Sequence, residues 1–229
     1  MNPDNVVYAA AVWIIPLVIA IVFHEVSHGW VARMLGDPTA HEQKRLSFNP
    51  LRHVDPIGTI VLPLILAIAK APVFGWAKPV PVRADRLRHP RSGMMIVALA
   101  GPGMNLALAL VAAITIGLFA QGLDGVRPEG IAGFVWANLI NFLLINIFLA
   151  VFNLLPIPPF DGGHVVEGLL PRSAVPAWQK LARFGFPLII VLLVFVPMLF
   201  PRANIVQRVV SPPADALTRA YLGLAALIA

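Results

Sequence analysis

An uncharged apolar run, Val6–Phe23, leads without interruption into the sequence His24-Glu25-Val26-Ser27-His28. A run of this length is close to what a helix needs to cross the hydrocarbon core of a bilayer. On a helix the two histidines lie on one face, which is the arrangement that binds zinc beside a carboxylate. An ionisable side chain at the centre of a membrane helix costs about 2.5–3.5 kcal/mol, so these residues are candidates for a functional site.

The composition is that of a membrane protein. Of the 229 residues, 59% are hydrophobic and 12% are charged, and the mean hydropathy is +0.82, whereas a soluble domain carries about 25% charged residues. The chain has no cysteine, so a metal ion would have to be held by His, Asp or Glu. The net charge of +6 is spread over short loops between apolar runs, as in membrane proteins, and gives no indication of nucleic-acid binding.

Four apolar runs are long enough to predict membrane-spanning helices. They lie near residues 6–34, 92–121, 131–156 and 184–201. A shorter apolar stretch is followed by alternating Pro and Val, so we expect residues 56–82 to form a short or re-entrant helix and then an extended segment. A C-terminal helix, amphipathic or short and spanning, is expected at 214–229. The sequence thus predicts an all-α, multi-pass transmembrane bundle with a short extended hairpin, as one domain over residues 1–229.

The basic residues predict the orientation. Residues 1–6 carry no Lys or Arg, whereas basic residues gather in 33–52, 70–91 and 161–183. Because cytoplasmic loops are enriched in Lys and Arg, we expect residues 33–52, 83–91 and 161–183 inside the cell and the N-terminus outside. His24 and His28 would then lie near the cytoplasmic face of the cell membrane. The arginines of the tail, 202–229, do not place it on either side.

The apolar setting favours a catalytic zinc site, which usually has three protein ligands and one open position. His24 and His28 provide two ligands, and Glu25 is placed to take a proton from water that the metal has acidified to a pKa of about 7. The expected third ligand is Asp161. It follows three prolines that interrupt an apolar run, and it precedes two glycines that permit a sharp turn.

Two amides within apolar runs have alternative interpretations. Asn105 and Asn153 either form interhelical hydrogen bonds, the common use of such residues, or donate to the carbonyl oxygen that becomes negative in the transition state. We favour catalysis for Asn153 and a structural role for Asn105. His164 either supports Asp161 or lies at the membrane surface. The histidines of the basic loops are expected to be solvated, and these are His41, His53 and His89.

Three motifs together resemble the site-2 protease family of intramembrane zinc metalloproteases. They are HEVSH at His24–His28, AGPGMN at Ala100–Asn105 and NLLPIPPFDGG at Asn153–Gly163. The stretch Asn49–Val82 is also similar to that of compact bacterial members without a PDZ domain.

The resemblance implies one Zn²⁺ per chain, with His24, His28 and Asp161 as ligands and Glu25 as the catalytic acid and base. It also implies that Asn153 assists near the scissile bond. The extended segment 70–82 would hold an unwound substrate by strand addition.

We therefore expect a zinc-dependent endopeptidase that hydrolyses peptide bonds in or near transmembrane segments of other proteins, in regulated intramembrane proteolysis. The alternative is a metal-binding transporter or permeation protein that uses the same three residues as a transit site, which would not need Glu25. The expected partners are a transmembrane protein substrate and the lipid bilayer. The sequence does not indicate the substrate, its cleavage position, the oligomeric state or the mode of gating.

Overall fold

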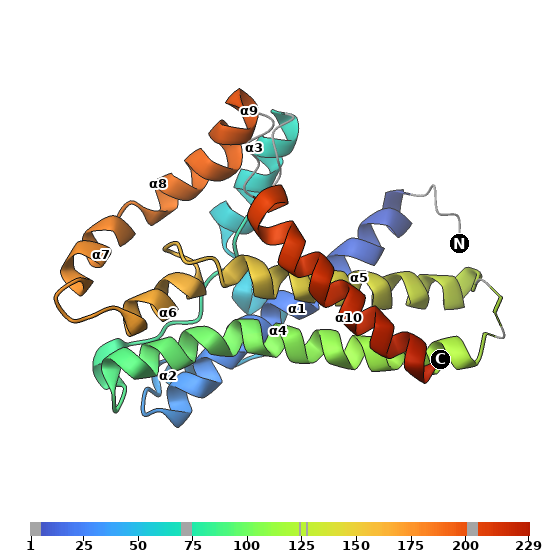
Figure 1. Ribbon diagram of the computed structural model, residues 1–229, viewed down its shortest axis with the longest axis horizontal. Helices are drawn as coiled ribbons and strands as arrows, with labels where there is room; N and C mark the ends of the chain where they lie inside the picture. The colour runs from blue at the N-terminus through green and yellow to red at the C-terminus, as the bar shows by residue number, and fades with distance from the viewer. Residues whose placement is uncertain (1–5, 70–74, 124, 127, 201–205) are drawn as a thin grey trace.

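Three long helices form the frame of the protein. The computed structural model describes residues 6–69, 75–123, 125–126, 128–200 and 206–229, and within them it is helical and contains no β-strand. The long helices are α1 (Val6–Met34), α4 (Pro90–Gln121) and α5 (Gly130–Asn153), and each is long and apolar enough to cross a membrane. They run side by side along the long axis of the molecule (Figure 1). The prediction of an all-α membrane protein is confirmed.

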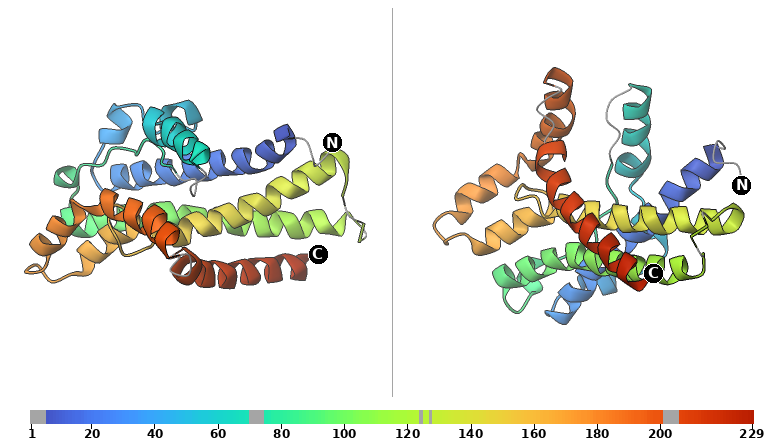
Figure 2. Two further views of the ribbon diagram at one scale, coloured as in Figure 1. Left: turned by 90° about the horizontal axis from the view of Figure 1, so that it is seen from above. Right: turned by 45° about the vertical axis from the view of Figure 1, so that its right-hand side comes forward.

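A fourth helix, α10 (Ser211–Ile228), covers one face of the α4–α5 pair, while α1 packs on the opposite face (Figure 2). Small residues allow the close approach of these helices. Ala109, Ala112 and Ala113 of α4 pack against Leu143 and Ile147 of α5 in a buried cluster. At Gly117 an added Cβ would lie 2.6 Å from the Ala225 carbonyl oxygen, so a side chain there would push α10 away.

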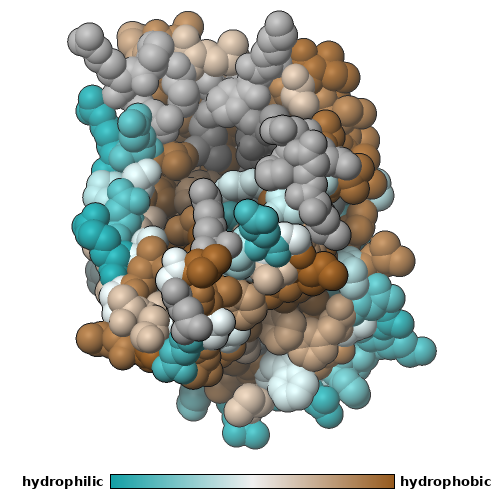
Figure 3. Space-filling model, turned by 90° about the vertical axis from the view of Figure 1, so that its right-hand side faces the viewer, coloured by the Kyte–Doolittle hydropathy of each residue, from teal (hydrophilic) through white to brown (hydrophobic). Residues whose placement is uncertain are grey.

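Large apolar side chains remain on the outside of this bundle. Trp13, Val111 and Leu118 are exposed although they belong to the long helices. In Figure 3, apolar side chains lie at the surface alongside polar patches. Such a surface is suited to contact with lipid, since soluble monomers rarely expose large contiguous apolar areas.

Short helical segments connect and flank the frame. They are α2 (Thr39–Glu42), η1 (Pro50–His53), η2 (Pro56–Val61), α3 (Leu62–Ile68), η3 (Ala84–Arg86), α6 (Asp161–Leu169), α7 (Val175–Ala182), α8 (Gly185–Ile190), η4 (Val191–Phe195), α9 (Val196–Leu199) and η6 (Val206–Val210). The span expected near 184–201 falls on α8, η4 and α9, and residue 201 lies outside the described residues. This segment is shorter than the three long helices, and its crossing of the membrane stays a prediction.

The segment expected at 56–82 consists of a short helix followed by irregular chain. Asp55 accepts hydrogen bonds from the backbone N–H groups of Ile57 and Gly58 and so caps η2, which continues into α3. Residues 70–74, including Lys70, lie outside the described residues. From residue 75 the chain returns past η2, and the Trp76 N–H donates to the Gly58 carbonyl oxygen at 3.1 Å.

His53 differs from its prediction as a solvated loop residue. It is buried, and its Nε2 donates to the Ser47 carbonyl oxygen at 2.7 Å. The returning chain covers it, because the Lys78 N–H donates to the His53 carbonyl oxygen at 2.8 Å. This contact joins residues far apart in sequence, so no local pattern could predict the burial.

Asp37 fixes the end of this returning segment to the end of α1. Its side chain is fully buried and accepts hydrogen bonds from the Thr39 N–H at 3.0 Å, the Thr39 hydroxyl at 2.5 Å and the Arg83 N–H at 2.6 Å. Burial acts to raise the pKa of Asp37, but these hydrogen bonds outweigh it, and the pKa lies below its ordinary value.

Replacing Asp37 by Asn should destabilise the protein at neutral pH by about 1.5–3 kcal/mol, the usual worth of hydrogen bonds to a charged group. Because the folded pKa is lowered, the contribution of Asp37 is present above the unfolded value of about 3.9 and is lost as the pH falls through the folded pKa. Thermal unfolding in detergent between pH 7 and pH 3 should therefore show a smaller acid loss for Asp37→Asn than for wild type. Asp85→Asn is the control, since Asp85 forms an exposed pair with Arg83; equal curves for wild type and Asp37→Asn would contradict the assignment.

Candidate metal centre

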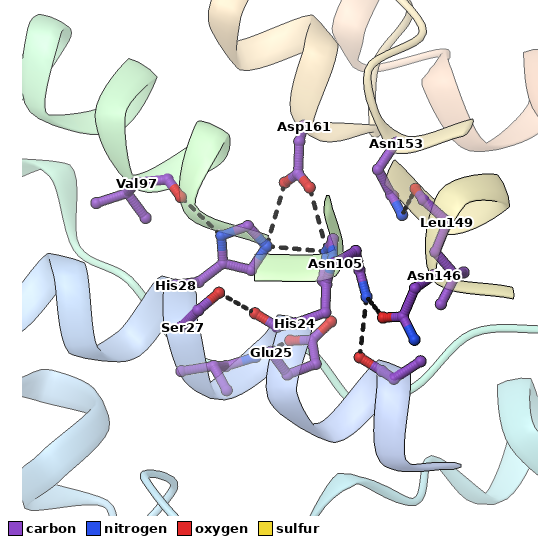
Figure 4. Close-up of polar contacts among 12 residues, drawn as sticks. His24, Glu25, Ser27, His28, Val97, Asn105, Asn146, Leu149, Asn153 and Asp161 are labelled. Carbon is purple, nitrogen blue, oxygen red and sulfur yellow. Dashed lines mark hydrogen bonds and ion pairs between the residues drawn. The ribbon is translucent and has the colours of Figure 1, made fainter. Parts of the chain in front are cut away.

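Two imidazoles from consecutive turns of α1 meet in the middle of the bundle. His24 and His28 are both buried, and their Nε2 atoms lie 3.1 Å apart. The spacing of four residues on a helix places both rings on the face that α1 turns toward α4 (Figure 4). The i, i+4 geometry predicted from the sequence is therefore present.

Asp161 reaches the same point from the other side of the bundle, as the first residue of α6 (Figure 4). Its Oδ2 lies 3.2 Å from His24 Nε2 and its Oδ1 lies 3.4 Å from His28 Nε2. The turn that places it needs glycine, because a Cβ at Gly162 would lie 2.3 Å from the carbonyl oxygens of Leu154 and Leu155. The start of α6 therefore packs directly on the backbone that leaves α5.

The other nitrogen of each ring has an acceptor. His24 Nδ1 lies 2.6 Å from Asn105 Oδ1, and His28 Nδ1 lies 2.7 Å from the Val97 carbonyl oxygen. Oxygens of this kind only accept, so each Nδ1 carries a hydrogen, and in the neutral ring each Nε2 then presents a lone pair. Two lone pairs and a carboxylate then face one another, an arrangement that calls for a cation between them.

The spacing of these three groups fits zinc. Tetrahedral zinc with bonds of about 2.0–2.1 Å separates its ligand atoms by about 3.3–3.4 Å, and the observed separations are 3.1, 3.2 and 3.4 Å. The Oδ2 atom of Asp161 is buried without a hydrogen-bond partner. Within the part of the chain that the structure describes, this is the one group of three His, Asp or Glu side chains close enough to share an ion.

Gly101 forms the wall of the site that α4 provides. An added Cβ would lie 2.5 Å from Cε1 of both histidines and 2.5 Å from His28 Nε2. Pro102 follows it inside the helix, where proline removes a helical hydrogen bond and displaces a carbonyl of the preceding turn. The Ala100–Asn105 motif thus serves the site in two ways, as a close backbone approach and as the source of Asn105.

Comparison with known proteins agrees with this geometry. The profile of Peptidase family M50 matches residues 125–196, which include Asp161. "Putative zinc metalloprotease YwhC" of Bacillus subtilis (strain 168) is 37% identical over 79% of this chain and 79% of its own length. The chain belongs to peptidase family M50. The resemblance to the site-2 protease family is therefore confirmed.

Two further relatives of this M50 peptidase carry names of the same form. MJ0611 of Methanocaldococcus jannaschii is 33% identical over 70% of this chain and 73% of its own length. Rip2 of Mycolicibacterium smegmatis is 28% identical over 76% of this chain and 63% of its own length. No solved structure gives a significant match.

Glu25, the predicted acid and base of this M50 peptidase, lies next to His24 on α1 and is half-buried. Its Oε2 accepts a hydrogen bond from the Val80 N–H at 2.8 Å. The irregular chain after residue 75 thus holds the carboxylate in place. Arg45 supports this part of the chain by donating to the carbonyl oxygens of Lys78 at 2.9 Å and Pro79 at 3.3 Å.

Asn153 does not contact the three groups that face the candidate metal position. Its Nδ2 donates to the Leu149 carbonyl oxygen of its own helix at 2.9 Å (Figure 4), and its role in catalysis stays a prediction. His164 is exposed on α6, and His41 and His89 are exposed as well. Sequence reasoning did not single out Val97, whose contribution is a backbone carbonyl, or Asn146, a further amide in an apolar run.

Gly101→Ala should abolish high-affinity zinc binding, because the new methyl group would overlap both imidazoles. Gly103→Ala is the matched control, since a Cβ at Gly103 meets nothing within 4 Å. Zinc retained after purification in detergent, measured by atomic absorption, should fall close to zero in the first variant and equal wild type in the second. Full zinc content in Gly101→Ala would show that the metal does not bind between these histidines.

Proposed function

We propose that this M50 peptidase is a zinc-dependent endopeptidase that cleaves peptide bonds in or near transmembrane segments of other membrane proteins, in regulated intramembrane proteolysis. The observation that carries the proposal is the convergence of His24, His28 and Asp161 on one point within apolar helices. A buried cluster of ionisable groups at membrane depth is costly and is a functional site by default.

His24, His28 and Asp161 would hold the zinc ion. Bound there, zinc supplies a Lewis acid that polarises the scissile carbonyl and acidifies water. Three protein ligands leave a position for the reactants, as in other catalytic zinc sites.

Glu25 acts as the acid and base in this proposal. Its carboxylate accepts a proton from the attacking water and later delivers it to the nitrogen of the leaving amine. The hydrogen bond from the Val80 N–H to Oε2 leaves the other oxygen available for this transfer. Asn153 would donate to the substrate carbonyl oxygen after releasing the Leu149 carbonyl oxygen that it contacts in this structure.

Cutting a transmembrane helix requires that it unwind, because a helix in lipid satisfies its own backbone and hides its amides. The chain from residue 75 to 82 lies against Glu25 and is a place where an unwound substrate could align. We propose that residues 1–229 act as one domain in the cell membrane, with transmembrane proteins as substrates.

The predicted orientation places the N-terminal end of α1 outside and the metal centre near the cytoplasmic face. Arg33 lies in the last turn of α1, Arg86 in η3, and Arg91 in the first turn of α4. The C-terminal end of α1 and the start of α4 lie at the end of the bundle opposite the α4–α5 connection (Figure 1). Lys and Arg gather on the cytoplasmic side of membrane proteins, which supports this orientation.

Glu25→Gln should lower cleavage of a co-expressed transmembrane reporter by about 10²–10⁴-fold, the usual worth of a general base, and leave the zinc content unchanged. The amide oxygen can still accept from Val80, so the local structure should persist. Glu129→Gln, an exposed carboxylate before α5, is the control and should cleave normally. Equal cleavage by Glu25→Gln and wild type would remove the mechanism, and zinc flux into proteoliposomes without any cleavage would favour the transporter.

Single cysteines test the orientation, because the chain contains none of its own. Glu129→Cys and His89→Cys lie at exposed positions beyond the two ends of α4. In intact cells a membrane-impermeant maleimide should label Glu129→Cys, and it should label His89→Cys only after permeabilisation. The reverse pattern would show that the protein is inserted the other way round.

A further inference from the structure

Behind His24 lies a pair of amides that is fully buried, with Asn105 on α4 and Asn146 on α5 both 0% exposed. Asn105 Oδ1 lies 2.6 Å from His24 Nδ1, and Asn105 Nδ2 donates to Asn146 Oδ1 at 2.7 Å and to the Ala20 carbonyl oxygen at 3.3 Å. Asn146 Nδ2 donates to the Phe142 carbonyl oxygen at 2.8 Å. The chain of hydrogen bonds therefore runs from α5 through α4 to the imidazole on α1 (Figure 4).

The direction of these hydrogen bonds is fixed by the backbone carbonyls at two points. Because a carbonyl oxygen only accepts, Phe142 takes the N–H of Asn146 and leaves its Oδ1 facing Asn105. That oxygen and the Ala20 carbonyl take the amide hydrogens of Asn105, which turns its Oδ1 to His24. The hydrogen of His24 is then on Nδ1, and the lone pair of Nε2 faces Asp161.

We propose that Asn146 is a positioning residue that, through Asn105, fixes the tautomer and ring orientation of His24 for metal binding. The inference rests on the proposed metal centre. Partners of the second nitrogen of a ligand histidine set which nitrogen is free to bind and raise its basicity. His28 obtains the same control from the Val97 carbonyl, so His24 is the ligand that depends on side chains from two other helices.

An ordinary packing role for Asn146 can be separated from this one, because α5 carries a suitable comparator. Asn141 also joins α5 to α1, by donating from Nδ2 to the Val12 carbonyl oxygen at 2.7 Å, and Val12 lies more than three helical turns before His24 on α1. Losing either amide removes an interhelical contact. Only the loss of Asn146 removes a partner of the group that holds His24.

The experiment compares Asn146→Leu with Asn141→Leu in the full chain purified in detergent. Co²⁺ replaces zinc as the probe, its affinity is measured by competition with a chelator, and its visible absorption reports the ligand geometry. Asn146→Leu should weaken Co²⁺ binding by about 10–100-fold, as the loss of such partners usually does, and should alter the absorption spectrum. Asn141→Leu should keep the Co²⁺ affinity and the absorption spectrum of wild type, even if its metal-free thermal midpoint falls by as much as that of Asn146→Leu.

Asn146→Asp is the conservative variant. Burial favours the neutral form of a carboxyl group, whose carbonyl oxygen can accept from Asn105 while its hydroxyl donates to the Phe142 carbonyl oxygen. This variant should return the Co²⁺ affinity and spectrum to near the wild-type values. Asn146→Ala removes the same oxygen and introduces a smaller side chain. It should show the same loss of Co²⁺ affinity and the same spectral change as Asn146→Leu, and it takes the place of the leucine variant if that variant does not fold.

Three results would overturn the inference: wild-type affinity and spectrum in Asn146→Ala, an equal weakening in Asn141→Leu, or no recovery in Asn146→Asp. Failure of the proposed metal centre is a different result, since wild type itself would then bind no Co²⁺. The inference alone would fail if wild type binds Co²⁺ and cleaves the reporter while Asn146→Ala binds Co²⁺ as tightly as wild type does.

Discussion

The structure depends on bringing one carboxylate and two imidazoles together inside the helix bundle. In water the Asp161 carboxylate would be hydrated. In the folded protein its oxygens lie 3.2 Å from His24 Nε2 and 3.4 Å from His28 Nε2 instead. Uncompensated burial of a carboxylate is so unfavourable that it must be paired or coordinate a metal. The position of α6 relative to α1 therefore depends on the contact between Asp161 and the two histidines. The rest of the bundle is arranged so that this contact can form.

Much of that arrangement depends on glycine, whose lack of a side chain lets neighbouring segments approach closely. Gly101 lets α4 approach both histidines, and Gly162 lets the first turn of α6 rest on the end of α5. Gly29 has the same function on α1, where an added Cβ would lie 2.5 Å from Leu46 and 2.8 Å from Val80. Glycine in a helix costs up to about 1 kcal/mol relative to alanine, and here it allows three segments to come within contact of the residues that carry the chemistry.

Local patterns in the sequence predict the parts of the site and of the fold that depend on neighbouring residues. The pairing of His24 with His28 follows from helical periodicity, and Asp161 could be found because three prolines and two glycines mark a break in an apolar run. The long helices appear in the structure as α1, α4 and α5, because uninterrupted apolar composition determines them.

What the sequence could not show depends on contacts between segments far apart in it. The Val97 carbonyl is a backbone atom of an ordinary apolar residue, and the burial of His53 arises from chain that returns over it. Asn146 did carry a signal, a polar side chain in a membrane helix, but nothing in the sequence joins it to Asn105 or His24.

The irregular chain beside Glu25 has a consequence for anything that pairs with it. Pro79 and Pro81 have no N–H, and the N–H of Val80 between them is already bonded to Glu25. Arg45 engages the Pro79 carbonyl oxygen. Over these three residues a neighbouring backbone therefore meets acceptors only, so an incoming polypeptide must supply all the donors there or first take the Val80 N–H away from the carboxylate.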